Sequence, residues 1–389
     1  MPAHRPRAGV YLHLPFCRVH CPYCSFNVFA GIDDLIPEYV ATLPRELDLR
    51  LDGRRPEVDS VYFGGGTPSL LGPAQVGGLL EAIAARTRLD PDSEITLEVD
   101  PGSADRDRLA GFVAAGVNRF TVGVQTFEPR LLRELGRAHD VADAVATLDD
   151  LEAVGARNVN IDLMFGLPRQ TPEDFDADLR RAIARGPAHL SLYNLTVEPG
   201  TGFDRRRRKG ALVLPSEDDQ AAMYRAAVDA TRGAGIERYE VSNFARAGRR
   251  SRHNSKHWRS APYFGLGAGA HGFAPARRLR WWNLKSPRRW ARAVDAGRLP
   301  EAGREELTAE ERLAEAVLVG LRTVEGLDRD RFLREFGVDP GADPTWAGGS
   351  DPRGGARVRV SPHHVRLTDA GFLVADHLAE RLLRRLDPP

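Results

Sequence analysis

The chain has 389 residues, 42% hydrophobic and 28% charged, and its 55 Lys and Arg against 54 Asp and Glu leave a formal net charge of +1. This composition is typical of a globular chain of about two to three domains, and the balanced charge argues against a nucleic-acid partner. No apolar run reaches the roughly 20 residues that cross a membrane, and the first residues lack a signal-peptide core. We therefore expect a cytoplasmic protein without a transmembrane segment.

Over residues 1–245, short β-rich runs alternate with amphipathic runs. Strands are predicted at residues 9–14, 58–63, 94–99, 119–124, 158–164, 189–194 and 238–242. Helices are predicted at residues 33–51, 73–88, 140–154, 171–185 and 217–232. This alternation predicts right-handed βαβ crossovers and a parallel sheet. Six such units are too few for a closed eight-unit barrel, which leaves a partial barrel or a doubly wound sheet.

The pattern changes after residue 245. Residues 246–305 are rich in Gly, His and aromatic residues, and we expect a flexible loop at 265–272 and packing roles for Trp281, Trp282 and Trp290. Residues 306–389 predict helices at 308–324, 332–336 and 368–386 and a hairpin of 358–360 with 365–367. This order resembles a winged-helix module. Residues 341–355 are too rich in Gly and Pro for a recognition helix, so we interpret 306–389 as a cap or interaction domain.

All three cysteines of the chain, Cys17, Cys21 and Cys24, lie in one window with C-x₃-C-x₂-C spacing. Three thiolates on a cubane iron–sulfur cluster leave one iron open to a non-protein ligand. The alternatives are a zinc site that recruits His13 or His20, and redox chemistry of the Cys21–Cys24 pair. The clustering of every thiol in one window favours the iron–sulfur cluster.

Other polar and glycine residues fall where the predicted strands end. They include Gly65, Gly66, Thr67, Glu98, Gln125, Arg137 and Asp162. In barrels, the carboxyl ends of the strands carry the active site, so several such loops at one mouth favour the partial barrel over the flat sheet. Local roles remain possible for single members, such as an Arg137–Glu ion pair or helix capping by Asp162. Together, these residues could hold an amino-acid-like cofactor beside the cluster.

The basic run 205–209 has two interpretations. A solvated surface segment is the usual one for a charge run. The other is a docking surface for an acidic partner or a carboxylated ligand.

The cysteine spacing after the first strand resembles the radical S-adenosylmethionine (SAM) superfamily. Further motifs resemble its oxygen-independent coproporphyrinogen III oxidase branch, which includes the HemW-type heme chaperones. These are the His-Leu-Pro-Phe-Cys run ending at Cys17, the Gly-Gly-Gly-Thr-Pro-Ser run from residue 64, the Gly-Val-Gln run ending at Gln125, the Leu-Gly-Arg run ending at Arg137, and the segments 160–163 and 166–168. The matches span residues 10 to about 272, and segment 367–371 resembles the C-terminal domain of the family.

The resemblance implies a partial (β/α)₆ TIM-like barrel with a C-terminal helical, winged-helix-like domain. It implies that the three cysteines bind a [4Fe–4S] cluster whose open iron takes the amine and carboxylate of SAM. The residues that match positions lining the SAM site or sites are Tyr11, Gly65, Gly66, Thr67, Glu98, Gln125, Arg137 and Asp162. The domains then run over 1–245 for the radical SAM barrel, 246–305 for a barrel-completing segment and 306–389 for the C-terminal domain.

Two members of the branch compete. The porphyrinogen oxidases resemble C-x₃-C-x₂-C-x-C, with a further cysteine where this chain has Phe26, and they carry a longer N-terminal lead-in. HemW-type proteins read C-x-F-N and carry a His-Asn-x-x-Tyr-Trp motif implicated in heme binding. This chain has His253 and Asn254 followed by His257 and Trp258, so His253 is the candidate heme ligand and His257, four residues on, an alternative. His271 is a third histidine that could line the pocket.

We therefore expect a HemW-type protein that binds heme and delivers it to recipient hemoproteins. The alternative is an enzyme that converts coproporphyrinogen III to protoporphyrinogen IX in a SAM-dependent reaction. A third class, in which the cluster is only an electron-transfer or structural centre, does not need the residues at the strand ends. Expected partners are heme or a porphyrinogen, the recipient hemoproteins, and an electron donor such as flavodoxin or ferredoxin.

Overall fold

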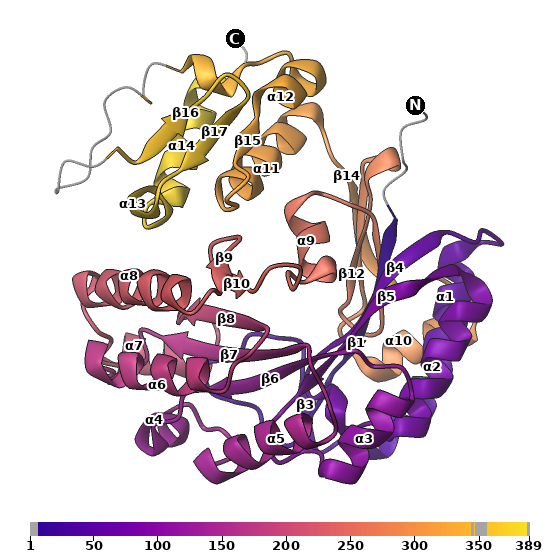
Figure 1. Cartoon of the computed structure of the whole chain (residues 1–389). Helices are drawn as coiled ribbons and strands as arrows, with labels where there is room; N and C mark the ends of the chain where they lie inside the picture. Colours follow the sequence, from indigo (N-terminus) through magenta and orange to yellow (C-terminus); the bar gives the residue numbers. More distant parts are fainter. Residues whose placement is uncertain (1–6, 344–345, 347–355, 387–389) are drawn as a thin grey trace.

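The computed structural model describes residues 7–343, 346 and 356–386 (Figure 1). Six parallel strands pair in chain order at its centre. They are β1 Ala8–Leu14, β4 Glu57–Gly65, β5 Arg88–Val99, β6 Arg119–Gln125, β7 Val159–Phe165 and β8 His189–Asn194. No pairing joins β1 to β8 within the described residues. The α/β class and the open barrel of six βα units are therefore confirmed.

The large sheet continues beyond the six strands at both edges. Beside β1 lie β11 Tyr263–Leu266, β12 His271–Ala274, β13 Leu279–Asn283 and β14 Glu301–Glu306; beside β8 lie β10 Asn243–Ala245 and β9 Glu237–Arg238. The strand predicted at 238–242 is wrong, because two shorter strands flank a turn there. The loop predicted at 265–272 is shorter in the structure: its two ends belong to β11 and β12, and residues 267–270 form the turn between them. Gly265 is there for close packing, since a Cβ on it would lie 1.7 Å from the His271 carbonyl oxygen.

Helices cover the outer face of the sheet (Figure 1). The long ones are α1 Ile36–Leu51, which a short 3₁₀ turn at Asp33–Leu35 precedes, α2 Pro73–Arg86, α5 Val141–Ala153, α6 Pro172–Ala184 and α8 Glu217–Gly233, close to their predicted bounds. The helices α3 Arg106–Ala114, α4 Pro129–Glu134, α7 Gly202–Arg208, α9 Arg252–Trp258 and α10 Pro287–Asp295 were not among those predicted. Capping boxes start α5 at Asp140 and α6 at Thr171.

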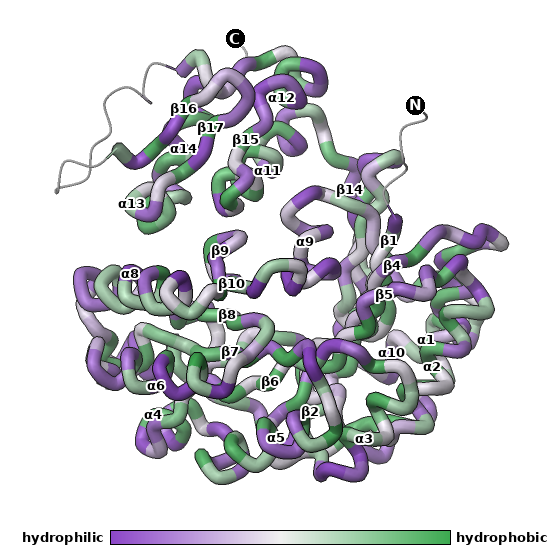
Figure 2. The backbone as a smooth tube through the Cα atoms, viewed as in Figure 1, coloured by the Kyte–Doolittle hydropathy of each residue, from purple (hydrophilic) through white to green (hydrophobic). Residues whose placement is uncertain are grey.

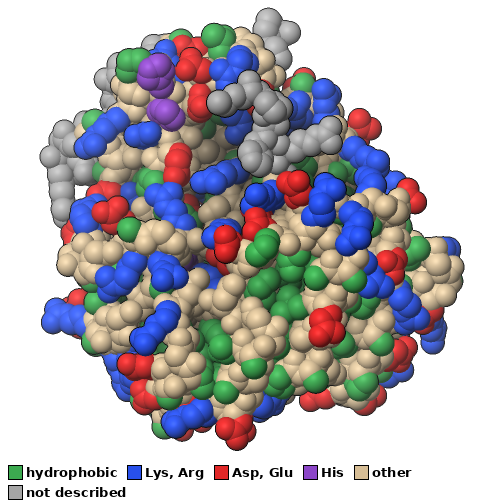
Figure 3. Space-filling model, turned by 45° about the vertical axis from the view of Figure 1, so that its right-hand side comes forward, with side chains coloured by type: hydrophobic (Ala, Val, Ile, Leu, Met, Phe, Trp, Pro, Cys, Tyr) green, Lys and Arg blue, Asp and Glu red, His purple; other side chains and the backbone are tan. Residues whose placement is uncertain are grey.

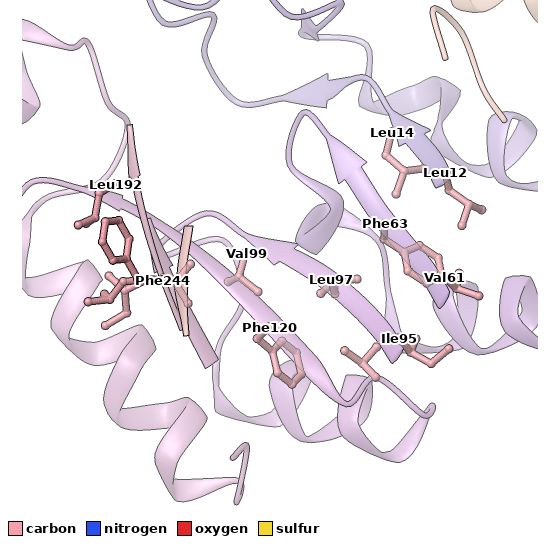
Figure 4. Close-up of a cluster of buried hydrophobic side chains, with 14 of the residues drawn as sticks. Leu12, Leu14, Val61, Phe63, Ile95, Leu97, Val99, Phe120, Leu192 and Phe244 are labelled. Atoms are coloured by element: carbon pink, nitrogen blue, oxygen red, sulfur yellow. The ribbon is translucent and has the colours of Figure 1, made fainter. Parts of the chain in front are cut away.

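The strands alternate between an apolar and a polar face. Figure 4 shows apolar side chains from one set of alternating positions, including Leu12, Phe63, Leu97 and Phe120, and all four are buried in one core. The other set is polar and carries Glu98 in β5. Successive strand residues point to opposite faces, so the apolar set packs under the helices and the polar set lines the barrel interior. Figure 2 shows the hydrophobic segments along the central strands.

Helix α9 closes the end of the barrel where the strands begin. The Glu94 carboxylate at this end of β5 accepts hydrogen bonds from the backbone N–H of Arg252 (2.9 Å) and of His253 (3.0 Å). It also accepts one from the hydroxyl of Ser251, the N-cap residue of α9. Glu94 thereby satisfies N–H groups that have no partner inside the helix. The helix that carries the His253 motif is thus fixed at the end opposite the cysteine loop.

The C-terminal domain docks at this same end (Figure 1). It contains α11 Ala309–Leu321, β15 Leu327–Asp328, α12 Arg329–Phe336, β16 Val358–Val360, β17 His364–Leu367, α13 Asp369–Phe372 and α14 Ala375–Leu386, with sheet order β15-β17-β16. Backbone hydrogen bonds at 2.9 and 3.1 Å tie Val241 to Arg322 and Val324 to Tyr239. The interpretation of 341–355 falls largely outside the described residues.

The C-terminal helices depart from the prediction at one point. The single helix predicted at 368–386 is divided into α13 and α14. Gly371 lies in α13 against the chain that enters β16, where a Cβ would come 2.1 Å from the Arg357 carbonyl oxygen. The helix is interrupted directly after this close approach.

The surface agrees with the balanced composition. Figure 3 shows positive and negative side chains interspersed over one face, with hydrophobic side chains gathered at its centre. Across the part of the chain that the structure describes, no helix combines the length and the apolar character needed to cross a membrane.

Candidate functional site

A cavity of about 510 Å³ opens at the carboxyl ends of the parallel strands. Ten of the twelve residues predicted to bind cluster or cofactor line it: Cys17, Cys21, Cys24, Gly65, Gly66, Thr67, Glu98, Gln125, Arg137 and Asp162. They come from the cysteine loop and from β4, β5, β6 and β7 or the segments that follow them. The structure therefore brings these residues to one mouth, whereas Tyr11 and His253 do not line the cavity.

The cysteine loop is fixed at its base and along its length. The short parallel strands β2 Phe16–Cys17 and β3 Phe29–Ala30 pair at its two ends. The Thr67 hydroxyl donates to Cys17 Sγ at 3.7 Å, and Cys21 Sγ donates to the Gly136 carbonyl oxygen at 3.7 Å. All three thiols are free. Two separate barrel segments thus position the sulfur atoms.

The donor set fits a cluster better than a single ion. No group of three or more His, Cys, Asp or Glu among the described residues is placed to hold one metal ion. The two ring nitrogens of His13 already contact Tyr11 Oη (3.1 Å) and the Asn27 carbonyl oxygen (2.9 Å), and His20 is exposed. Neither histidine joins the cysteines in a group that could hold one ion among the described residues. Iron–sulfur clusters are held by cysteine thiolates, and the thiols here surround the mouth of a cavity.

Burial keeps the Cys17 thiol protonated in the metal-free chain. Burial raises the pKa of Cys17 to about 11, and the hydrogen bond from Thr67 only partly offsets this rise. A metal must therefore displace the proton when it binds.

The glycine run after β4 is required by its approach to the cysteine loop. A Cβ on Gly66 would lie 2.5 Å from the Phe16 carbonyl oxygen and 3.0 Å from Cys17 Sγ. Gly65 has φ +112°, a conformation that favours glycine. The backbone N–H of Gly65 donates to Glu98 Oε2 at 3.1 Å, so this run also joins the cysteine loop to β5.

Two half-buried carboxyl groups, those of Glu98 and Asp162, line the cavity. Burial raises the pKa of Glu98 to about 7 and that of Asp162 to about 6. Tyr62 donates to Glu98 Oε1 at 2.8 Å, and Asn160 donates to Asp162 Oδ1 at 2.7 Å. Burying a carboxylate without a cationic partner is costly. Both groups are therefore suited to accept hydrogen bonds from a cationic or hydroxyl-bearing ligand.

Arg137 is held by four partners, one of which is the Tyr23 hydroxyl. It forms an ion pair with Asp100, donates to the Gly123 carbonyl oxygen at 3.2 Å, and approaches Cys21 Sγ at 3.9 Å. The local alternatives for single residues are thus resolved: Arg137 pairs with Asp100 instead of a Glu, and Asp162 lies on β7 instead of capping a helix. Gln125 has φ +68°, an uncommon conformation for a residue other than glycine, and this re-aims the chain at the end of β6.

Tyr11 and His253 lie deeper in the barrel. Tyr11 pairs in register with Tyr62, one level below the pair formed by His13 and Gly64. His253 is 2% exposed, contacts Ser60 Oγ through Nδ1 at 3.1 Å, and its Nε2 has no hydrogen-bond partner. Its ring centroid lies 6.2 Å from that of Tyr11. The predictions of Tyr11 at the SAM site and His253 at a heme site stay predictions, without support from the cavity.

The lining also includes residues outside the predicted cofactor-binding set, among them Tyr23, Asp100 and Tyr193. Tyr23 lies between two of the cysteines, and its hydroxyl is 3.5 Å from Arg137 Nη1. Asp100 directly follows β5, at a strand end like several of the predicted residues. Tyr193 lies on the polar face of β8, which the alternation of that strand indicates.

Comparison with known proteins identifies the scaffold. The family model "Radical SAM superfamily" matches residues 11–182. "Heme chaperone HemW" of Bacillus subtilis is 35% identical over 85% of this chain and 87% of its own length, and that of Escherichia coli is 37% identical over 86% and 87%. The solved structure of coproporphyrinogen III oxidase (HemN) from Escherichia coli has a TM-score of 0.81 and covers 97% of this chain and 90% of its own, but at 24% identity it shows the fold alone.

The residues that carry the motifs converge on one mouth, and the similarity to the curated relatives extends over most of each chain. Membership of the superfamily implies a [4Fe–4S] cluster and SAM as cofactors. The chain belongs to the radical SAM superfamily and, within it, to the HemW family.

Proposed function

We propose that this protein binds heme and delivers it to hemoproteins from a radical SAM scaffold. The observation that carries the proposal is similarity to proteins named heme chaperones over 85% and 86% of the chain. The match to the superfamily model ends at residue 182. The similarity to the chaperones therefore extends well beyond the barrel core that all superfamily members share. We place the protein in the cytoplasm, where its three thiols stay reduced.

Cys17, Cys21 and Cys24 would hold the [4Fe–4S] cluster, and the strand-end residues would hold SAM. When bound, the reduced cluster supplies the electron that cleaves the sulfonium of SAM. The Gly65–Gly66 backbone lies close enough to the cysteine loop to bind a ligand that spans both. Glu98 and Asp162 would accept hydrogen bonds from its ammonium and hydroxyl groups, and Arg137 would donate to its carboxylate. A bare electron-transfer centre requires none of these groups.

The alternative, coproporphyrinogen III oxidation, is disfavoured at residue 26. Phe26 stands where the oxidases have a further cysteine, and its side chain is 67% exposed beside the cavity. All three cysteines of the chain are assigned to the cluster, so no thiol is left for that position. The TM-score of 0.81 with the oxidase reflects the shared fold.

The heme ligand is the open part of the proposal. His253 would need α9 to move, because its ring is buried against Tyr62 at a centroid distance of 5.1 Å. His257 lies one turn later on the same helix, is exposed, and has its ring 4.6 Å from that of Tyr263. We therefore propose that His257 is reached by heme without rearrangement, and His253 only if α9 opens.

One experiment separates these possibilities. The cluster is reconstituted anaerobically, and the protein is titrated with heme or incubated with SAM, reductant and coproporphyrinogen III. We expect heme binding at one equivalent and no protoporphyrinogen IX. Protoporphyrinogen formation would support the oxidase instead. His253→Ala and His257→Ala, with the exposed His363→Ala as control, then assign the ligand by the loss of the heme Soret band.

A further inference from the structure

A second hollow approaches the cysteine loop from outside the barrel. This outer groove, of about 500 Å³, is lined by residues 20–22, 24–26, 199–202 and 205. Cys21 and Cys24 line both this groove and the barrel cavity, whereas Cys17 lines only the cavity. A protein bound in the outer groove would therefore reach the cysteine loop without competing with a ligand inside the barrel.

Helix α7 forms one wall of the groove and is joined to the cysteine loop. The backbone N–H of Phe203 donates to the Pro22 carbonyl oxygen at 2.9 Å. Gly202 packs so closely that a Cβ there would lie 2.8 Å from Pro22 Cβ. The basic run 205–209 is thus held beside the cysteines by direct contact.

The two segments that form the groove are basic, although only one Arg, Arg205, lines the groove itself and the chain as a whole is nearly neutral. Segments 18–26 and 199–209 contain six Arg and Lys and one carboxylate, Asp204, against a net charge of +1 for all 389 residues. Asp204 is buried and pairs with Arg207 (3.0 Å) and Arg208 (2.6 Å), but these two side chains remain 53% and 69% exposed. Arg206 pairs with Glu134 of α4 at 2.5 Å. Arg205 and Lys209 are exposed and have no ion-pair partner among the described residues. A positive potential therefore faces solvent at this site.

Apolar side chains lie within this basic surface. Phe26 is 67% exposed and Val19 is 39% exposed, and Phe26 lines both hollows. Large exposed apolar side chains surrounded by charged ones are typical of sites for protein partners. Small interfaces of this kind are used in weak redox encounters, where complementary charge sets the association rate.

We propose that the outer groove and α7 form the docking surface for an acidic one-electron carrier protein, which reduces the cluster from outside the barrel. One electron leaves the carrier, for example from a flavin hydroquinone anion, and reduces the cluster by one electron without proton transfer. This inference rests on the proposed function in that the cysteine loop must hold a reducible cluster. The place of the docking surface rests on charge and geometry alone. Of the two interpretations of the run 205–209, it favours a docking surface over a solvated segment.

The test reverses two charges that have no ion-pair partner among the described residues. Arg205 donates only to the Gly200 carbonyl oxygen, at 3.1 Å, and Lys209 has no side-chain partner among residues 7–343. The variant is Arg205→Glu with Lys209→Glu. The matched control is Arg277→Glu with Arg298→Glu, because both of these residues are also exposed. Arg277 follows β12 and Arg298 follows α10, and both elements lie away from α7 (Figure 1).

The first readout is the affinity of the cluster-free protein for an acidic flavodoxin, measured by calorimetry at low and at physiological salt. The second is the rate of cluster reduction by reduced flavodoxin and, separately, by dithionite. We expect the α7 variant to lose about tenfold or more in affinity and in flavodoxin-driven rate at low salt, with much of the difference removed by salt. The dithionite rate and the control variant should match the unmodified protein.

The inference is overturned if the α7 variant binds flavodoxin as tightly as the unmodified protein, or if the control loses as much. It is also overturned if the unmodified protein shows no salt-dependent binding to flavodoxin. Absence of any dithionite-reducible cluster in the unmodified protein would instead contradict the cluster assignment, so the two failures are distinguishable.

Discussion

The ionised Glu98 carboxylate should lower the free energy of unfolding of the cofactor-free protein, and replacing Glu98 by a neutral residue should raise it. Its pKa rises from 4.5 to about 7, chiefly because the group is buried. A carboxyl group whose pKa is raised on folding binds more protons in the folded state, so stability falls as pH rises through this window. A shift of 2.5 units corresponds to about 3 kcal/mol at pH 8.

Glu98→Gln removes this penalty but loses the acceptor for the Gly65 N–H, which costs about 1 kcal/mol. The variant should therefore be about 2 kcal/mol more stable than the unmodified protein at pH 8. With an unfolding entropy of about 2.1 cal/mol/K per residue, this corresponds to about 2–3 °C in melting temperature. At pH 5 the gain should disappear, because Glu98 is then protonated in the folded state.

The assay is thermal unfolding of the cluster-free protein at both pH values, together with SAM binding to the reconstituted protein. Glu240→Gln is the control: burial raises the pKa of Glu240 to about 7 too, but Glu240 lies between the barrel and the C-terminal domain. Both variants should be stabilised at pH 8, and only Glu98→Gln should weaken SAM binding. A Glu98→Gln protein that melts below the unmodified one at pH 8 would refute the reasoning.

Three further predictions follow from the packing of the site and the core. Gly66→Ala should lower iron content after reconstitution, because its Cβ would overlap the Phe16 carbonyl oxygen. The control Gly78→Ala, on the open face of α2, should leave iron content unchanged and slightly stabilise the helix. Arg137→Gln leaves Asp100 without its ion-pair partner and should weaken SAM binding in calorimetry more than it lowers the melting temperature. Trp290→Ala should lower the free energy of unfolding, measured with denaturant, by about 3–5 kcal/mol, since Trp290 is fully buried and donates to Glu46 at 2.8 Å. The iron content of Trp290→Ala protein that remains folded should not fall.

The sequence predicted the strand-end residues well for a physical reason. In parallel βα units every strand ends at the same mouth, so a polar or glycine residue at a strand end is placed without knowledge of long-range contacts. Glu98 and Gln125 were found in this way. Tyr11 does not line the cavity because it lies three residues before the end of β1, one level deeper, in register with Tyr62.

Other features depend on contacts that local pattern does not carry. The spacing of His253 and His257 indicated one helix face, but the anchoring of α9 under the barrel depends on Glu94, more than 150 residues away. The basic run 205–209 contains no apolar residue, so an apolar pattern could not predict helix α7 there. Its position beside the cysteines follows from the hydrogen bond between Phe203 and Pro22.

The most direct test of the central claim is heme transfer. The heme-loaded protein is mixed with an apo-hemoprotein, and the acceptor is isolated and its heme content measured over time. The account predicts that heme appears in the acceptor faster than it does from a heme-loaded albumin control, while coproporphyrinogen III stays unchanged in a parallel incubation. Heme that stays on the protein, or protoporphyrinogen IX in the parallel incubation, would contradict it.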